Sequence, residues 1–255
     1  MYTKLIVTLP LLALLTACGA GLTGSTSFQT LSVLGNGDGI GRGTSDDGSA
    51  ALFYSPAINE VVNSANASQS SSVSNIKASD FPITSQSGNV RIRSGTMTDG
   101  GTTMNITGVE DIGTTDAAAV FIQMPSGYRD LSMVTGTPYT HVAAGSYTYN
   151  GTQMTTSSRS IAPGSTGSFS LVADFGQGTF GYSGRSGNVN VSGSGVLDTV
   201  NGRFATSGLS VTSGSSSYGG TMHGLMHGSG ATATSGIFHT SGSSPAYTGA
   251  FVGSK

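Results

Sequence analysis

Glycine is the residue that most restricts what this chain can fold into. The 255 residues include 40 glycines, 21 of them between residues 164 and 253, and only seven prolines. The glycines follow no three-residue period, which excludes a collagen helix. A chain kept disordered by its charge would carry a net charge much larger than −2. We therefore predict a folded β protein that is rich in Gly, Ser and Thr.

The low charge also limits the partners of the chain. Lys and Arg total 10, Asp and Glu total 12, and the basic residues are scattered along the sequence. Binding to nucleic acid needs a basic patch or stripe on one face of a protein. We therefore exclude nucleic acid as a partner.

Residues 1–17 are predicted to be a lipoprotein signal peptide. The apolar run LIVTLPLLALL at residues 5–15 has 11 residues, whereas a membrane span takes about 20. The tetrapeptide Leu15-Thr16-Ala17-Cys18 resembles the bacterial lipobox, which implies that Cys18 is lipidated and begins the mature chain. Because an Asp after the lipidated Cys usually retains a Gram-negative lipoprotein at the inner membrane, Gly19 implies the outer membrane. Cys18 is the only cysteine, so the chain forms no internal disulfide.

The mature chain divides by composition into three parts. Residues 18–75 are predicted to be a flexible tether because they are rich in Gly and Ser, with residues 50–62 as a short strand or helical turn. Residues 76–137 are predicted to be a small β-rich region. Its expected strands are Val90–Arg93, Thr102–Thr107 and the apolar run Ala118–Met124.

Residues 138–255 are predicted to form a β-barrel. Apolar residues alternate with mostly polar ones from Phe169 to Phe175, which is typical of a half-buried strand, and Gly176-Gln177-Gly178 follows as a tight turn. Eight to nine strands at turn spacing close most simply into an antiparallel up-and-down barrel of eight strands, filled by its own side chains. A membrane-spanning barrel is disfavoured because the strands are short and the chain has no Trp. The other expected strands are Tyr139–Tyr149, Thr179–Tyr182, Asn188–Val191, Gly202–Thr206, Leu209–Thr212, Thr221–His227, Ala231–His239 and Tyr247–Val252.

Several segments of this part resemble the barrel domain of transferrin-binding protein B and its relatives. Residues 167–181 resemble that family's G-x-F-x-L-x-V-D-F-G-x-G-T-x-x-G hairpin, and residues 224–238 its G-x-F-x-G-P-x-A-x-E-x-x-G-x-F hairpin. In the second hairpin Met226, Ser229 and Ala233 stand where the family has Phe, Pro and Glu. Residues 247–255 resemble the usual end of the barrel. The shared residues are turn and packing residues, so they imply a fold rather than a ligand.

The resemblance implies a lipoprotein anchored in the outer membrane, at the cell surface, with an outer-membrane translocation partner. Family members include proteins that bind host iron-carrier or complement proteins. We predict a non-enzymatic protein that binds a protein or small solute through its barrel loops. The alternative is a structural or assembly component of the outer membrane without a diffusible ligand.

None of the motifs that suggest an enzyme or metal site has the surrounding sequence that such a site requires. Two stretches, residues 19–24 and 176–181, fit G-x-G-x-x-G, but neither lies between a strand and a helix as a dinucleotide site requires. Asn36, Asp38, Asp46 and Asp47 lack the glutamate that would complete a calcium loop. Glu110 and Asp111 are adjacent and would point to opposite faces of a strand. We predict no catalytic residues and no cofactor.

The histidines are predicted not to form a metal site. His223 and His227 have the spacing of a helical metal pair, but Gly224 and Gly228 favour a strand. Four residues of strand span about 13 Å, which is too far for two rings to share one ion. Either His141 or His239 could meet one of them across the sheet, and we expect surface or turn positions for all of them.

The lipid anchor gives the first testable prediction. Because Cys18 is the only cysteine, Cys18→Ala should abolish acylation and release the protein from the membrane fraction. The measurement is fractionation of cells that express each form, together with metabolic labelling by a fatty acid. A Cys18→Ala protein that still sediments with membranes would contradict the prediction.

Overall fold

The computed structural model describes residues 40–43, 52–55, 60–63, 76–77, 83–99, 102–111, 113, 117–123, 131–137, 139–140, 142, 144–157, 164–240 and 247–255. These residues form β-strands and the turns between them. Within them no helix is long and apolar enough to cross a membrane. Cys18, Asn36, Asp38, Asp46, Asp47, His141 and the first G-x-G-x-x-G lie outside the described residues.

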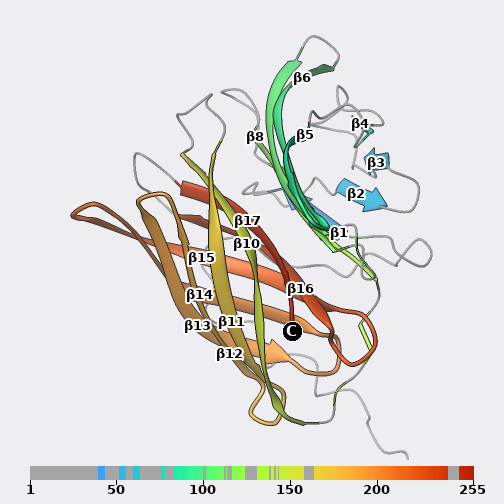
Figure 1. Cartoon of the computed structure of the whole chain (residues 1–255), viewed down its shortest axis with the longest axis vertical. Helices are drawn as coiled ribbons and strands as arrows, with labels where there is room; N and C mark the ends of the chain where they lie inside the picture. Colours follow the sequence, from blue (N-terminus) through green and yellow to red (C-terminus); the bar gives the residue numbers. More distant parts are fainter. Residues whose placement is uncertain are drawn as a thin grey trace, which may run out of the picture.

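The C-terminal part is a closed antiparallel barrel of eight strands, as predicted (Figure 1). Each strand pairs with the next one in sequence, and the first strand pairs with the last to close the barrel. The strands are β10 (Ser146–Ser157), β11 (Ser165–Asp174), β12 (Thr179–Ser186), β13 (Val189–Asp198), β14 (Arg203–Ser213), β15 (Ser216–His227), β16 (Ala233–Thr240) and β17 (Tyr247–Ser254).

Several strand predictions in the barrel were too short: β12 continues past Tyr182 to Ser186, β13 past Val191 to Asp198, and β15 begins at Ser216 rather than at Thr221. Two further predictions were wrong in their bounds for other reasons. The opening strand begins at Ser146 rather than at Tyr139, because Tyr139 turns its side chain onto the end of the barrel, where its hydroxyl donates to the Thr199 carbonyl at 2.7 Å. The segments Gly202–Thr206 and Leu209–Thr212 form the single strand β14 with a bulge between Thr206 and Leu209. The Thr206 hydroxyl stabilises the bulge: it donates to the Ser194 carbonyl and accepts from the Gly208 amide.

The preceding part of the chain forms a six-stranded sheet in the order β1-β9-β8-β7-β6-β5. Its strands are β1 (Ile40–Gly43), β5 (Ile83–Ser87), β6 (Val90–Asp99), β7 (Thr102–Asp111), β8 (Ala118–Gln123) and β9 (Leu131–Thr135). A second sheet contains β2 (Leu52–Ser55), β3 (Glu60–Asn63) and β4 (Ile76–Lys77). Strands β1, β2 and β3 thus lie within residues 18–75, where the sequence predicted a tether.

The six-stranded sheet covers one part of the barrel's outer wall. Figure 1 shows the green strands of this sheet beside β10 and β17. Ile92, Val109, Ala119 and Val134 of the sheet belong to one buried apolar cluster with four outward-facing barrel residues, Met154, Ile237, Ala250 and Val252. The sheet and the barrel are therefore joined by an apolar interface as well as by the chain itself.

Glycine and phenylalanine face each other in pairs across the barrel strands. Each of five inward phenylalanines lies directly opposite a glycine of a neighbouring strand, and a Cβ on that glycine would lie under 3.0 Å from a ring atom. The rings thus occupy the space that a side chain would need, as in the packing of aromatic residues over glycine in coiled sheets. The pairs are Phe169–Gly151, Phe180–Gly195, Phe204–Gly224, Phe238–Gly249 and Phe251–Gly236.

These pairs predict the effect of adding a single methyl group. Gly249→Ala should destabilise the barrel by about 1–3 kcal/mol, because the new Cβ would collide with the Phe238 ring. Gly181→Ala is the control, since a Cβ on Gly181 meets nothing within 4 Å. That substitution should be neutral or slightly stabilising. Urea unfolding followed by circular dichroism measures both free energies, and equal losses would contradict the pairing.

Candidate functional site

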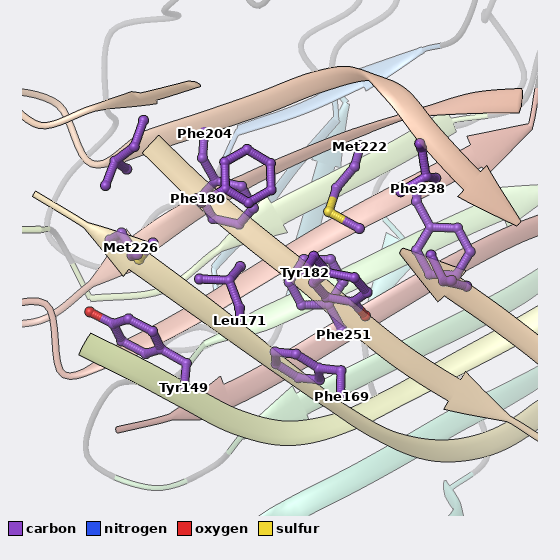
Figure 2. Packing of buried hydrophobic residues seen from close by; sticks show 14 of the residues in the cluster. Tyr149, Phe169, Leu171, Phe180, Tyr182, Phe204, Met222, Met226, Phe238 and Phe251 are labelled. Carbon is purple, nitrogen blue, oxygen red and sulfur yellow. The ribbon is translucent and has the colours of Figure 1, made fainter. Parts of the chain in front are cut away.

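The interior of the barrel is packed with side chains. Figure 2 shows aromatic, leucine and methionine side chains from many strands gathered between them. The rings contact each other closely: Phe169 and Tyr182 lie 5.3 Å apart between centroids, and Tyr182 and Phe251 lie 4.8 Å apart. Contacts of this kind add to the stabilisation from burial alone. The described interior is therefore a core and not a container for a ligand.

One end of this core holds a buried hydrogen-bond network around Gln153. The Tyr182 hydroxyl donates to Gln153 Oε1 at 2.6 Å, and Gln153 Nε2 donates to Ser186 Oγ at 2.6 Å. Ser186 Oγ also lies 2.7 Å from Thr155 Oγ1. Burial raises the pKa of Tyr182 well above its usual value, so the phenol remains a neutral donor. The network satisfies the polar groups at this end of the barrel.

The other end is closed by residues around Tyr139, which belongs to the connection from β9. The Tyr139 ring stacks on Phe175 with centroids 6.3 Å apart, and the Tyr147 ring meets the edge of Phe175. Lys255 Nζ lies 4.0 Å from the Tyr147 ring centroid. These contacts cover the base of the core.

The wall formed by β10 to β13 carries a shallow groove lined by Ser, Asn and Arg residues together with Gly, Phe and Val. Its volume is about 570 Å³, and Arg185 is the one charged residue among those that line it. Outward side chains from neighbouring strands lie in register, so they form two rows across the wall. One row contains Asn150, Ser170, Ser183 and Ser192, and the other Thr152, Ser168, Arg185 and Asn190. We take this surface, named the β10–β13 face, as the candidate binding site.

The structure places the predicted histidines differently from expectation. His223 and His227 lie on strand β15, as predicted, but both are buried, with 5% and 2% of their surfaces exposed, so the expectation of surface positions was wrong. They face outward at the part of the wall where the six-stranded sheet packs. His239 is opposite Thr221 rather than a second histidine, and its ring contacts the Thr221 hydroxyl.

The other candidate residues have structural partners. Residues 176–178 lie in the turn between β11 and β12, where Gly178 has a φ of 65°, and residues 179–181 begin β12. Glu110 accepts from Arg93 Nε at 2.8 Å and Arg91 lies 3.8 Å away, whereas Asp111 accepts from the Gly113 amide. Among the described residues, no group of three or more His, Cys, Asp or Glu side chains could hold a metal ion.

Sequence reasoning missed the ion pair of Glu110, the network of Gln153 and the burial of His227. The first could have been found from the period of two on β6, which places Arg91 and Arg93 on one face. The other two depend on which strands become neighbours and which wall is covered. The sequence of a single strand indicates neither its neighbouring strands nor the layer that covers it.

Comparison with known proteins was made for families, curated proteins and solved structures. No family model and no curated protein matches the chain. The chain is similar to solved structures of transferrin binding protein B. The intact protein with its N and C lobes matches 89% of this chain over 47% of its own length, at 14% identity and a TM-score of 0.45. The chain thus spans about half the length of that protein.

Two further structures match over nearly their full length. A transferrin binding protein B variant from Actinobacillus pleuropneumoniae shares 11% identity, with 86% of this chain and 99% of that chain covered and a TM-score of 0.41. A structure described as a surface lipoprotein shares 13% identity, with 86% and 98% covered and a TM-score of 0.42. The first two of these three structures carry the name of the family whose barrel hairpins the sequence resembles.

The network around Gln153 gives a prediction about the core. Gln153→Leu and Tyr182→Phe should each destabilise the protein by about 1–3 kcal/mol, because each leaves a buried partner without its hydrogen bond. The double variant should lose less than the sum of the two, since both partners of the bond are then absent. Thermal or urea unfolding of the four proteins measures the coupling. Additive losses would show that the bond contributes nothing to stability.

Proposed function

We propose that the chain is a lipid-anchored protein of the outer membrane or cell surface, that it is not an enzyme, and that it binds a protein or small solute. The anchor is Cys18, and the proposed parts are the signal peptide at residues 1–17, the tether at 18–75, the β-rich region at 76–137 and the barrel at 138–255. The lipobox and Gly19 support the location, and the resemblance to surface lipoproteins supports the class.

The observation that carries the binding role is the closed and filled interior of the barrel. Tyr149, Leu171 and Phe251 are fully buried there, so a ligand cannot occupy the centre without unfolding the core. The six-stranded sheet covers the wall at β15, β16, β17 and β10 through an apolar interface. A partner therefore has to bind on the outside of the barrel, on the wall that the sheet leaves uncovered or on the loops.

The β10–β13 face suits contact with a polar surface. Its hydroxyl and amide groups can both donate and accept hydrogen bonds, and Arg185 adds one positive charge. Val172 and Val196, 44% and 68% exposed, extend the same wall with apolar surface. Polar groups around a modest apolar area are the usual composition of a non-obligate protein interface. The segments 158–163 and 241–246, which we propose also contribute, lie outside the described residues.

Site-directed crosslinking tests the proposal. The chain from Gly19 contains no cysteine, so a single introduced thiol carries the crosslinker at one known position. Ser183→Cys places it on the β10–β13 face, and Ser87→Cys is the control because Ser87 is exposed at β5 of the other sheet. The labelled proteins are incubated with an extract of cell-envelope and host-fluid proteins.

The expected result is a partner that saturates in a pull-down with the unmodified chain and is crosslinked from Ser183 but not from Ser87. Equal crosslinking from both positions would place the contact elsewhere. Repeated failure to find a saturable partner would favour a structural role in the outer membrane.

A further inference from the structure

His227 lies on the covered side of the barrel, facing the chain that joins the sheet to the barrel. Met222 and Met226 of strand β15 point into the core, so the alternate residues His223, Leu225 and His227 point outward. Leu225 packs on the apolar cluster shared by the two parts. His227 is therefore an interface residue of the sheet and the barrel.

The ring of His227 contacts the connection that leads from β9 to β10, which we call the linker and whose described residues are 136–137, 139–140, 142 and 144–145. Nε2 lies 2.6 Å from Ser235 Oγ, and the ring also hydrogen-bonds to the backbone of Thr137. Gly136 lies against the ring so closely that an added Cβ would be 2.6 Å from Nδ1. The imidazole thus fills the space under the first two linker residues.

The neighbouring residue Gly228 fixes the same part of the linker. Its amide donates to the Thr137 carbonyl at 3.1 Å, and its carbonyl accepts from the Thr140 amide at 3.2 Å. Between these bonds lies Tyr139, whose ring stacks on Phe175 and closes the base of the barrel. The linker therefore contacts His227, closes the base of the barrel through Tyr139 and connects the barrel to the sheet.

We propose that His227 is an acid-sensitive latch between the two parts of the molecule: its protonation releases the linker from the barrel and loosens the sheet that the linker holds. In the neutral state one ring nitrogen donates to the Thr137 backbone and Nε2 accepts from Ser235. A protonated ring has two N–H groups and no acceptor. The Ser235 hydroxyl must then turn, and a charge is placed in a site with 2% exposure.

The described strands that pack most extensively on β15 offer no negatively charged side chain to compensate. The described elements packed on β15 are β14, β16 and β9, and none of them contains Asp or Glu. Arg203 on β14 lies opposite Leu225, and Tyr218, His223 and His239 are the other titratable residues on β15 and β16. Asp198 on β13 is paired with Arg203 and bonded to Asn201. Positive charge at His227 therefore meets only basic or neutral neighbours on these elements.

The direction of the pH effect follows from burial. Desolvation lowers the pKa of His227 from its usual 6.5 to about 4, although the Thr137 bond opposes this shift. A released ring regains a pKa near 6.5. The released state binds more protons between these values, so docking is complete above pH 6.5 and weakens as the pH falls toward 4. Each pH unit in this window shifts the ratio of released to docked linker by up to about tenfold.

Hydrogen exchange of the chain from Gly19 tests the latch. We expect the protection factors of the Thr140 and Gly228 amides, corrected for intrinsic exchange, to fall about a hundredfold between pH 7 and pH 4.5. Amides beside the turn of the β12–β13 hairpin, at residues 187–188, should retain their protection, because that turn lies at the opposite end of the strands from Phe175 and Thr199, which Tyr139 contacts. Parallel loss across the hairpin would mean global unfolding and would overturn the proposal.

Two variants separate His227 from the other histidines. His227→Gln keeps a hydrogen-bonding side chain that does not titrate, so protection of the linker should become independent of pH. His239→Gln is the control and should leave the pH dependence unchanged, because His239 contacts Thr221 and not the linker. Unchanged pH dependence in His227→Gln would overturn the latch.

If His227→Gln does not fold, an NMR pH titration of His227 in the unmodified protein tests the latch instead. The ring signals of His227 in the NMR spectrum should titrate well below pH 6 while the protein stays folded. A midpoint at or above pH 6.5 would show that the folded state accommodates the charge, and the latch would then be wrong.

Discussion

The packing of aromatic rings onto glycines inside the barrel is the constraint on which the rest of the structure depends. In two of these pairs, Phe238 lies opposite Gly249 and Phe251 opposite Gly236. Each ring occupies the space that a side chain at the glycine position of the neighbouring strand would need. Repeated around the wall, these pairs let eight strands of 8–12 residues enclose a core of large side chains. The same packing fills the space that a ligand would need, so it moves any binding function to the outside of the barrel.

The outside of the barrel is divided by the six-stranded sheet. Where the sheet packs, outward residues are apolar or buried, as with Ile237, Ala250 and His227. Where it does not, serines, threonines and asparagines line the wall in register. One wall of the barrel therefore serves stability and the other is available for contact. Because the linker leads from the sheet to the base of the barrel, the state of His227 affects both the interface and the closure of the core.

The repeated strand pattern allowed much of the barrel to be predicted. The alternation from Phe169 to Phe175 identified the faces of β11 correctly, since Phe169 and Leu171 are buried and Val172 is exposed. The bounds of β10 and β14 were predicted less well. Tyr139 fits the apolar pattern of a strand, but its side chain caps the end of the barrel. The bulge at Thr206 interrupts the period of two without ending strand β14. A local pattern cannot distinguish a capping residue or a bulge from a strand end.

The sequence by itself determined the β class, the eight-stranded closure and the absence of an internal disulfide, because glycine spacing, alternation and cysteine content are properties of the chain alone. Only the tertiary structure decided that His223 and His227 are buried, that Gln153 meets Tyr182 and that β10–β13 form the open wall. An outward strand residue faces water unless another layer covers it. The covering layer here comes from strands β6 to β9, which pack onto residues far along the chain through nonlocal apolar contact.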